Sequence, residues 1–528
     1  MPAGNQCIVL HAHLPYIRHP ECETFLEENW LFEALTETYL PLLLMLERLG
    51  ADGFRDCLTL SLSPTLMTML RDPFLQARYL AHMDKLRRLA EHEVRRTRND
   101  PAFAPLARLY QEHFEEAVAA FDTRYNRDLL TALARLQADG VLELITTAAT
   151  HGYLPLMKTE PAAVRAQLLV GAQAFRDMIG VPARGVWLPE CGYYPGLEGL
   201  IEEAGYAYFF VDSHGILNAT PKPYYGLDAP VACPNGVAAF GRDPESSRKV
   251  WSRDEGYPGD FHYRDFYRDI GFDLDFKYIK PFILDGHTRI HTGFKYYRIT
   301  GPGEHKLPYD PAAAAGRIAA HAEDFVARSR RHVAAMGGRQ RLTPLIVSPY
   351  DAELFGHWWF EGPQWLEEVV RRMAQQPEAV ALTTPSAYLK RHPALQSATP
   401  SASSWGDGGY NAFWLNPGND WIYPHLHDAA RRMNALARQH GNAVPGSLTY
   451  RALQQAGRSL LLAQASDWAF IMKSDTAKNY ALRRTRDHLA RFNYLEQSVR
   501  DGNTDERKLQ ALEVMDQVFP GLQPDVYC

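Results

Sequence analysis

Short apolar runs that alternate with segments of helical periodicity are the feature that most limits what this chain can fold into. Several of the runs end in histidines, carboxylates or aromatic residues, and they comprise residues 7–10, 58–62, 141–147, 186–188, 208–211, 345–348 and 381–384. This alternation is typical of parallel sheets and barrels, because helices cover strands that are buried on both faces. Ligands bind such folds at the carboxyl ends of the strands. The sequence therefore predicts an α/β fold with its site at the strand ends.

Helical patterns fill much of the remaining chain. Residues 65–139 place apolar side chains at helical spacing among many Arg and Glu residues, and an Asp-Gly turn signal ends them. Further helices are predicted at residues 161–179 and 196–204. Residues 397–404 contain only Ser, Ala, Thr and Pro, so we expect a linker there, followed by mostly helical chain.

Residues 242–273 break this rhythm. They combine charges, glycines and aromatic residues without a clear period, and Tyr257 lies near their middle. A long loop inside a compact domain usually has a function. We therefore expect this segment to be a functional loop.

Composition excludes several classes of protein. A chain of 528 residues is too long for a single core, so we expect one large domain with additions, or two to three domains. The formal net charge is −6 and no basic run is flanked by aromatics, which argues against a nucleic-acid partner. No apolar stretch approaches the length of a membrane span, and the first residues lack the features of a signal peptide. The six cysteines show no CxxC spacing, so we expect reduced thiols and a cytoplasmic protein. The oligomeric state cannot be inferred from these data.

Carboxylates follow two of the predicted strands. Glu190 follows the run at residues 186–188, with tyrosines close behind it, and Asp351 and Glu353 follow the run at residues 345–348. Aromatic side chains beside a carboxylate suit a sugar, because pyranose rings stack on flat side chains. Cleavage of a glycosidic bond needs two carboxyl groups, about 5–5.5 Å apart in retaining enzymes. Asp351 and Glu353 would share a face of an extended chain, so their spacing does not decide which one acts. Capping or surface acids are the alternative interpretation of all three.

Histidines follow two other predicted strands. His11 and His13 would share one face of an extended chain, and His151 follows the run at residues 141–147. With a carboxylate they could bind a divalent metal that activates water, or they could be neutral groups that hold sugar hydroxyls. A structural histidine is the commonest outcome for any single one. No serine nucleophile elbow, Walker loop or GxGxxG motif is present, which argues against acyl transfer, nucleotide hydrolysis and dinucleotide binding.

Tryptophans gather beyond residue 404. Trp405, Trp414 and Trp421 lie among Gly, Asp and Asn, a poor setting for core packing, so we expect them to stack on sugar or to line a cleft. Trp187, by contrast, lies in an apolar run and is expected to be at least partly core.

Four motifs occur in an order that resembles glycoside hydrolase family 57: HAHLP at residues 11–15, HGYLP at 151–155, WLPE at 187–190 and DAELFGH at 351–357. Within that family the chain looks most like the 1,4-α-glucan branching enzymes. Three stretches favour this subgroup: WSRDEGYPGD at 251–260, TGFKYYRITG at 292–301 and QASDWAF at 464–470. The resemblance covers nearly the whole chain.

The resemblance implies a distorted (β/α)7 barrel formed by residues 1–65 and 140–390. It also implies a helical insertion at 66–139 and an all-helical C-terminal domain at 391–528 that contributes to the cleft. Glu190 would be the nucleophile and Asp351 the general acid/base. The residues expected to bind an α-1,4-glucan are His11, His13, His151, Trp30, Trp187, Tyr257, Trp405, Trp414, Asp467 and Trp468. Neither a metal nor a cofactor is implied.

The reaction implied is transfer of an α-1,4-glucan segment to a 6-hydroxyl, as in glycogen biosynthesis. Tyr257 is the aromatic of residues 242–273 that we expect to reach the accepting side. A 4-α-glucanotransferase or α-amylase of the same family is the alternative within this enzyme class. A metal-dependent hydrolase using His11 and His13, and a glucan-binding module without turnover, are alternatives from other classes.

Overall fold

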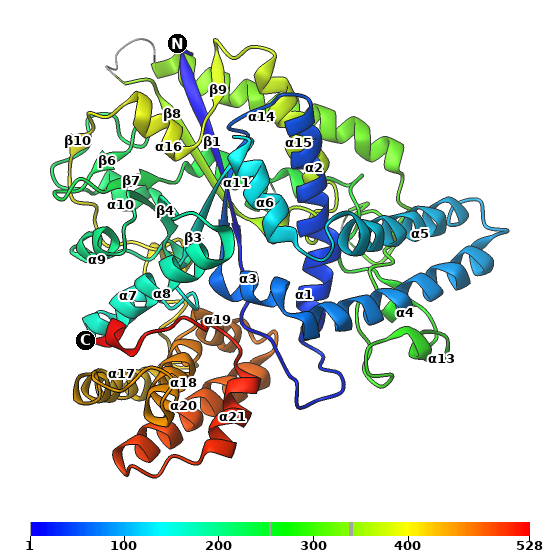
Figure 1. Ribbon diagram of the computed structural model, residues 1–528. Coiled ribbons are helices and arrows are strands. Elements are labelled where there is room, and N and C mark those ends of the chain that lie inside the picture. Colours follow the sequence, from blue (N-terminus) through cyan, green and yellow to red (C-terminus); the bar gives the residue numbers. More distant parts are fainter. Residues whose placement is uncertain (1, 253–254, 302, 337–341) are drawn as a thin grey trace.

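A curled, almost wholly parallel sheet forms the centre of the molecule, and its longest strand, β1 (Gly4–Ala12), crosses the middle of the view in Figure 1. The structure is a computed structural model that describes residues 2–252, 255–301, 303–336 and 342–528. Within these residues the strands follow the order β10-β6-β7-β5-β4-β3-β2-β1-β8, and β9 pairs with β1 as well. The other strands are β2 (Leu58–Leu62), β3 (Leu142–Thr147), β4 (Gly185–Trp187), β5 (Tyr208–Val211), β6 (Val231–Ala232), β7 (Ala238–Gly241), β8 (Leu345–Asp351), β9 (Val380–Leu382) and β10 (Gln396–Ser397).

The two sides of this sheet approach each other. The backbone N–H of Asp243, which follows β7, donates to the carbonyl of Val347 in β8, and the N–H of Leu345 donates to the carbonyl of Asp228. Among the named strands of the described residues, only β6 and β7 pair in antiparallel fashion. The structure therefore confirms the α/β fold and the distorted barrel.

Side chains fill the interior of the barrel. Cys7 and Val9 of β1 pack there with Trp187 of β4 and Val347 of β8, whereas Ile8 and Leu10 point to the surrounding helices. This alternation follows from the two-residue period of a strand. It places the next residue of the same series, His11, above the filled interior.

Helices surround the sheet and extend it on two sides. The helices between β2 and β3 are α3 (Pro64–Arg71), α4 (Pro73–Thr97), α5 (Ala104–Val118) and α6 (Leu129–Ala138). Figure 1 shows α4 and α5 projecting away from the barrel. The helices that follow the barrel are α17 (Ile422–Gln439), α18 (Leu448–Ala463), α19 (Ser466–Ser474), α20 (Lys478–Arg500) and α21 (Glu506–Met515). They lie together at the opposite end of the molecule from the N-terminus (Figure 1).

The remaining helices are shorter or lie against the sheet. They are α1 (Glu28–Ala34), α2 (Leu40–Ala51), α7 (Leu154–Met157), α8 (Pro161–Ile179), α9 (Leu197–Glu203), α10 (Ser213–Leu217), α11 (Pro244–Trp251), α12 (Ile270–Asp273), α13 (Phe276–Ile279), α14 (Pro311–Met336), α15 (Gly362–Ala374) and α16 (Pro385–Arg391). A π-helical turn, η1 (Leu35–Tyr39), joins α1 to α2.

The predicted linker at residues 397–404 is wrong. Ser397 belongs to β10, Thr399 exchanges backbone hydrogen bonds with Thr220, and Ser403 does so with Tyr193. The small side chains let this segment lie flat against the sheet and the strand-end turns, so their composition reflects close packing instead of flexibility.

The predicted loop at residues 242–273 also needs correction. Its first part is helix α11, which Asp243 caps by accepting a hydrogen bond from the N–H of Ser246. Arg253 and Asp254 lie outside the described residues. Strand β7 was not predicted, because the sequence AAFG offers too short an apolar run.

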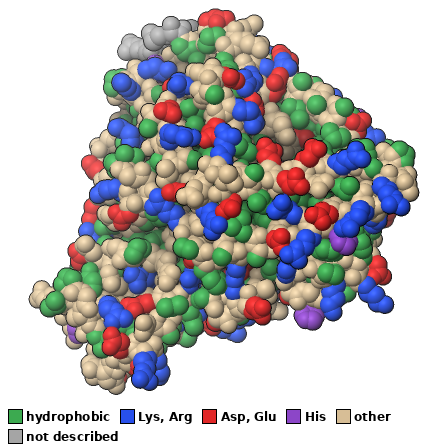
Figure 2. All heavy atoms as spheres, turned by 45° about the vertical axis from the view of Figure 1, so that its right-hand side comes forward, with side chains coloured by type: hydrophobic (Ala, Val, Ile, Leu, Met, Phe, Trp, Pro, Cys, Tyr) green, Lys and Arg blue, Asp and Glu red, His purple; other side chains and the backbone are tan. Residues whose placement is uncertain are grey.

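Acidic and basic side chains are interspersed over the face shown in Figure 2. None of the helices in the described part of the chain combines the length and the hydropathy needed to span a bilayer.

Gly356 allows the turn after β8 to pack tightly against η1. Its φ is +112°, and a Cβ at this position would collide with the carbonyl oxygen of Glu37. We expect Gly356→Ala to lower the free energy of unfolding by about 2 kcal/mol or more, because left-handed backbone strain adds to the collision. Gly316→Ala is the matched control, since Gly316 lies on an exposed face of α14 with nothing near its Cβ. Equal stability of the two variants in urea denaturation would contradict this account.

Candidate active site

The carboxyl ends of β1, β4 and β8 open into one cleft with a volume of about 1280 Å³. Its wall includes the polar side chains that follow these strands and others from distant parts of the chain: His11, His13, Trp30, His151, Glu190, Asp351, Glu353, Trp405 and Asp467. The structure therefore brings together most of the residues predicted from the sequence.

Strand pairing explains how the acid and the histidine of two strands meet. His11 and Asp351 are register partners in the parallel pair β1 and β8. Asp351 is the last residue of β8 and shares the inward face with Val347, just as His11 shares the inward face with Val9. Both side chains therefore stand above the barrel interior.

Glu190 lies in a tight turn directly after β4. Its backbone is left-handed, with φ +60°, in the short helical turn of residues 189–191. The indole Nε1–H of Trp405 donates to its Oε2 at 2.9 Å, and the hydroxyl of Ser466 donates to its Oε1 at 3.2 Å. Burial raises the pKa of Glu190 to about 6, although these hydrogen bonds oppose the shift. The carboxyl group is thus held by two donors and still ionises near neutral pH.

Asp351 and Glu353 differ in their surroundings. Burial, together with the negative charges of Glu353 and Glu190, raises the pKa of Asp351 well above its usual range. Glu353 accepts hydrogen bonds from the Tyr39 hydroxyl at 2.5 Å and from the His13 backbone N–H at 3.1 Å. Residues 352–354 form a short helical turn, so the two acids do not share the face of an extended chain. Glu353 is held by these two hydrogen bonds, whereas the surroundings of Asp351 favour its protonated form.

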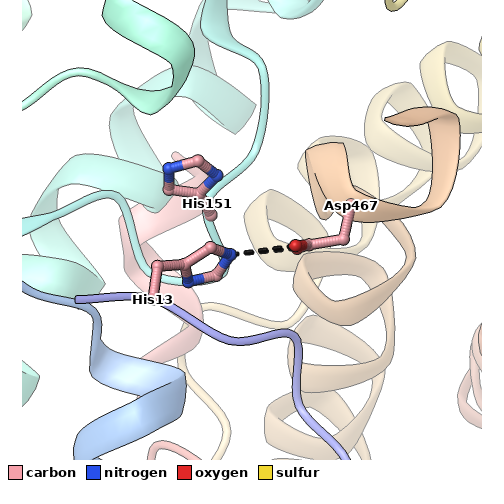
Figure 3. A group of neighbouring side chains, drawn as sticks. All are labelled: His13, His151 and Asp467. Carbon is pink, nitrogen blue, oxygen red and sulfur yellow. Dashed lines mark hydrogen bonds and ion pairs between the residues drawn. The ribbon is translucent and has the colours of Figure 1, made fainter. Parts of the chain in front are cut away.

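The rings of His11, His13 and His151 stack on one another. Figure 3 shows two of them, His13 and His151, with Asp467. The rings of His13 and His151 are 4.0 Å apart, and His11 lies flat on Trp187 at 4.8 Å. Burial lowers the pKa values of His11 and His151 well below the ordinary range, so both are neutral. Burial lowers the pKa of His13 as well, but the carboxylate of Asp467, 3.0 Å from its Nε2, outweighs this and leaves the pKa raised.

The neutral histidines form one directed chain of hydrogen bonds that ends at Glu190. His151 Nδ1 lies 2.9 Å from the Ser466 hydroxyl oxygen, and because that hydroxyl donates to Glu190 it accepts from His151. His151 Nε2 then accepts from His11 Nε2 at 3.0 Å, and His11 Nδ1 accepts from the Ser61 hydroxyl at 3.1 Å. Counting donors in this way fixes the tautomer of both histidines.

His13, His151 and Asp467 lie close enough to be considered as metal ligands, since their nearest ligand atoms are within 4.8 Å of one another (Figure 3). Both ring nitrogens of His151 already belong to the hydrogen-bond chain, and His13 Nε2 already donates to Asp467. A metal ion would have to break these bonds, so the arrangement does not fit a metal centre.

Five residues that were expected to bind sugar or to line a cleft do not line this one; the first is Trp421, which is half-buried against the core. Trp187, Trp414, Trp468 and Tyr257 are buried. Trp414 stacks on Tyr153 at 4.4 Å, in a space that Gly406 leaves open, so the nearby glycines make room for a core tryptophan. Trp468 donates from its indole to the carbonyl of Leu462. The hydroxyl of Tyr257 donates to Asp324, which directs the ring away from the cleft. The structure therefore places these four side chains in the interior and not in the cleft wall.

Sequence reasoning missed Ser466 and a set of aromatic residues. Ser466 precedes Asp467 in a motif that was recognised, but a serine carries no signal of its own. Exposed aromatic side chains line the cleft where Tyr257 was expected; they are Trp251, Phe261, Tyr267, Trp358 and Phe470. Trp251, Trp358 and Phe470 belong to stretches already quoted or adjoin them, which is the signal that could have identified them.

Comparisons with known proteins agree with this site. The profile of glycosyl hydrolase family 57 matches residues 7–398, and that of the 1,4-α-glucan branching enzyme C-terminal region matches residues 425–527. The 1,4-α-glucan branching enzyme TK1436 of Thermococcus kodakarensis is 33% identical over 98% of this chain and 77% of its own length.

Two solved structures are also similar over nearly their whole length. The α-amylase AmyC from Thermotoga maritima has a TM-score of 0.92 and 43% identity, with 99% of each chain covered. The family 57 branching enzyme from Pyrococcus horikoshii has a TM-score of 0.89 and 32% identity, with 99% of this chain and 97% of that chain covered.

Ser466→Ala should raise the pKa of Glu190, because it removes a hydrogen bond that stabilises the carboxylate. A carbodiimide labels protonated carboxyl groups, so labelling of Glu190 should persist to higher pH in this variant. Mass spectrometry of the Glu190 peptide across a pH series measures the midpoint. Ser474→Ala, at the other end of α19, is the control and should leave the midpoint unchanged. An unshifted midpoint in Ser466→Ala would show that Ser466 does not donate to Glu190.

Proposed function

The chain belongs to glycosyl hydrolase family 57, and on that premise we propose that it is a 1,4-α-glucan branching enzyme. One observation carries the proposal: two carboxyl groups, one directly after β4 and one at the end of β8, share a cleft with exposed aromatic residues. Their surroundings raise the pKa of Glu190 to about 6 and that of Asp351 well above its usual range. The similarity to named branching enzymes along the whole chain supports the assignment.

In the first step Glu190 attacks the anomeric carbon of an α-1,4-linked glucosyl unit. Asp351 donates its proton to the departing 4-hydroxyl oxygen, so the glycosidic bond breaks as the bond to Glu190 forms. The raised pKa of Asp351 keeps that proton available near neutral pH. Glu190, held by Trp405 and Ser466, is ionised above about pH 6.

In the second step Asp351 is ionised and acts as the base. It removes the proton of a 6-hydroxyl on an acceptor glucan, whose oxygen attacks the glucosyl carbon and releases Glu190. Two displacements at one carbon retain its configuration. His13, which bonds Asp467 through Nε2 and keeps Nδ1 without a partner among the described residues, would hold a hydroxyl group of the sugar before the cut. His11 and His151 would line the same part of the subsite. Trp30 and Trp405 would form further parts of the wall around the substrate.

We also propose the compartment in which the reaction takes place. A retaining enzyme that adds α-1,6 branches to an α-1,4-glucan acts in the cytoplasm during synthesis of a glycogen-like polymer. The six cysteines, none paired with another, are compatible with a reducing compartment.

Hydrolysis of α-1,4-glucan is the second candidate, because the structure named as an α-amylase is 43% identical to this chain. The carboxyl groups would act in the same way, and water would replace the 6-hydroxyl in the second step. A family 57 4-α-glucanotransferase would use a 4-hydroxyl instead.

Incubation with amylose distinguishes these activities. We expect α-1,6 linkages to form in large excess over new reducing ends, measured by debranching followed by reducing-end assays. Reducing ends without branches would establish hydrolysis. Glu190→Ala and Asp351→Ala should each lower kcat by several orders of magnitude, because each removes a group that acts in the transition state.

The pH profile of kcat/KM should show an acidic limb near pH 6, where Glu190 ionises. Glu353→Gln removes a negative charge that raises the pKa of Asp351, so the alkaline limb should move to lower pH. Glu323 forms an ion pair with Arg372 at the surface, so Glu323→Gln is the control and should leave both limbs in place. If the alkaline limb stayed unchanged in Glu353→Gln, the assignment of Asp351 as the general acid would be contradicted.

A further inference from the structure

A pair of stacked aromatic rings lies in the cleft wall that continues from Asp351. Trp358 and Phe266 are nearly parallel, with centroids 4.2 Å apart and planes inclined by 24°, and both line the cleft. The Trp358 side chain is 51% exposed. Asp351, Glu353 and Leu354 also line the cleft, and Trp358 follows them closely in the sequence after β8.

Buried charged side chains surround and support the ring pair of Trp358 and Phe266. His357 Nδ1 lies 2.8 Å from Glu37, and the same carboxylate accepts from the buried guanidinium of Arg264 at 3.1 Å. The rings of Phe266 and His357 meet edge to face at 5.2 Å. The pair therefore rests on an ion network that is not part of the proposed chemistry.

A buried lysine fixes the second ring. Lys295 donates to the Phe266 carbonyl at 2.6 Å, and its ammonium lies 4.7 Å from the centre of the Phe266 ring. Asp269, which is also buried, lies 3.6 Å from that ammonium. Burying so many charges to hold two partly exposed rings has no evident benefit to stability. It does keep the rings in place before a ligand arrives, which reduces the entropy lost on binding.

We propose that Trp358, stacked on Phe266, is a binding platform for a glucose ring of the acceptor glucan. This inference rests on the proposed function. The acid that protonates the departing oxygen marks the leaving-chain side of the cut, and the acceptor must occupy the same side in the second step. Trp358 follows Asp351 in the turn after β8 and lines the same cleft, and on this ground we assign the platform to that side.

The chemistry of the platform fits a glucan. The flat hydrophobic face of a glucose ring stacks on an indole, and its hydroxyl groups remain available to water and polar neighbours. Polar groups lie nearby in the same cleft, where Lys306 pairs with Asp265 at 3.2 Å. Stacking tolerates small shifts along the ring, which suits a polymer that must slide until a 6-hydroxyl reaches Asp351 and the glucosyl carbon bound to Glu190.

Trp358→Ala tests the platform. Amylose serves as donor, and a fluorescently labelled maltooligosaccharide, varied in concentration, serves as acceptor. We expect the acceptor KM to rise roughly tenfold and reducing-end release to rise relative to transfer, because about 1.4 kcal/mol of stacking is lost. The KM for amylose should rise as well, because the leaving chain of the donor occupies the same side of the cleft in the first step. Trp358→Phe should restore part of the acceptor affinity.

Tyr224→Ala is the matched control, because Tyr224 is 86% exposed and lies outside the cleft. An unchanged acceptor KM in Trp358→Ala would overturn the proposal, as would equal loss of cleavage and transfer together with a lower melting temperature. The same assay tests the proposed function separately. A wild-type enzyme that forms no labelled branches would refute that function, whatever the result for Trp358→Ala.

Discussion

The buried carboxylate of Glu190 is the constraint on which the rest of the site depends. A carboxylate in the mouth of a filled barrel is unstable unless donors are aimed at it. Its two donors, Trp405 and Ser466, come from chain that follows the barrel strands. The backbone N–H of Trp405 also bonds to the carbonyl of Glu190, so the segment at 397–404 and the turn after β4 are fixed together. The helices beyond the barrel are therefore part of the site and do not merely cover it.

The hydrogen bonds that pass through His11 and His151 all have their donors on the side away from Glu190 and their acceptors on the side toward it. Each member donates toward Glu190, beginning at Ser61 in the neighbouring strand, and burial keeps both imidazoles neutral. A chain of this kind needs every partner, because one missing donor leaves a buried acceptor unpaired. Asp351 stands outside the chain, in an environment that keeps its proton. The pKa values of the two carboxyl groups therefore differ because of their surroundings, and not because one belongs to Glu and the other to Asp.

Much of this architecture follows from local pattern. Strand β2, helix α8 and strand β5 begin and end where the sequence predicted, because each has strong periodicity between clear turn signals. Strand β7 was missed because AAFG is too short and too small to be recognised. The residues at 397–404 gave the composition of a linker, but small side chains serve equally well where chain packs flat on a sheet. The boundaries proposed for the three domains remain predictions.

By itself the sequence determined the alternating α/β pattern, the acids and histidines at the strand ends and, through its motifs, the family. Each of these features can be recognised from residues that are close together in the sequence, since periodicity and strand-end position are local properties. Only the tertiary structure decided which tryptophans face the cleft, that Ser466 completes the hydrogen-bond chain, and that Trp358 and Phe266 form one surface. Trp405 and Trp414 have similar neighbours in sequence, yet one contacts Glu190 and the other packs under Tyr153. Those outcomes depend on contacts between residues far apart in the chain, and no local pattern encodes which side chains will meet.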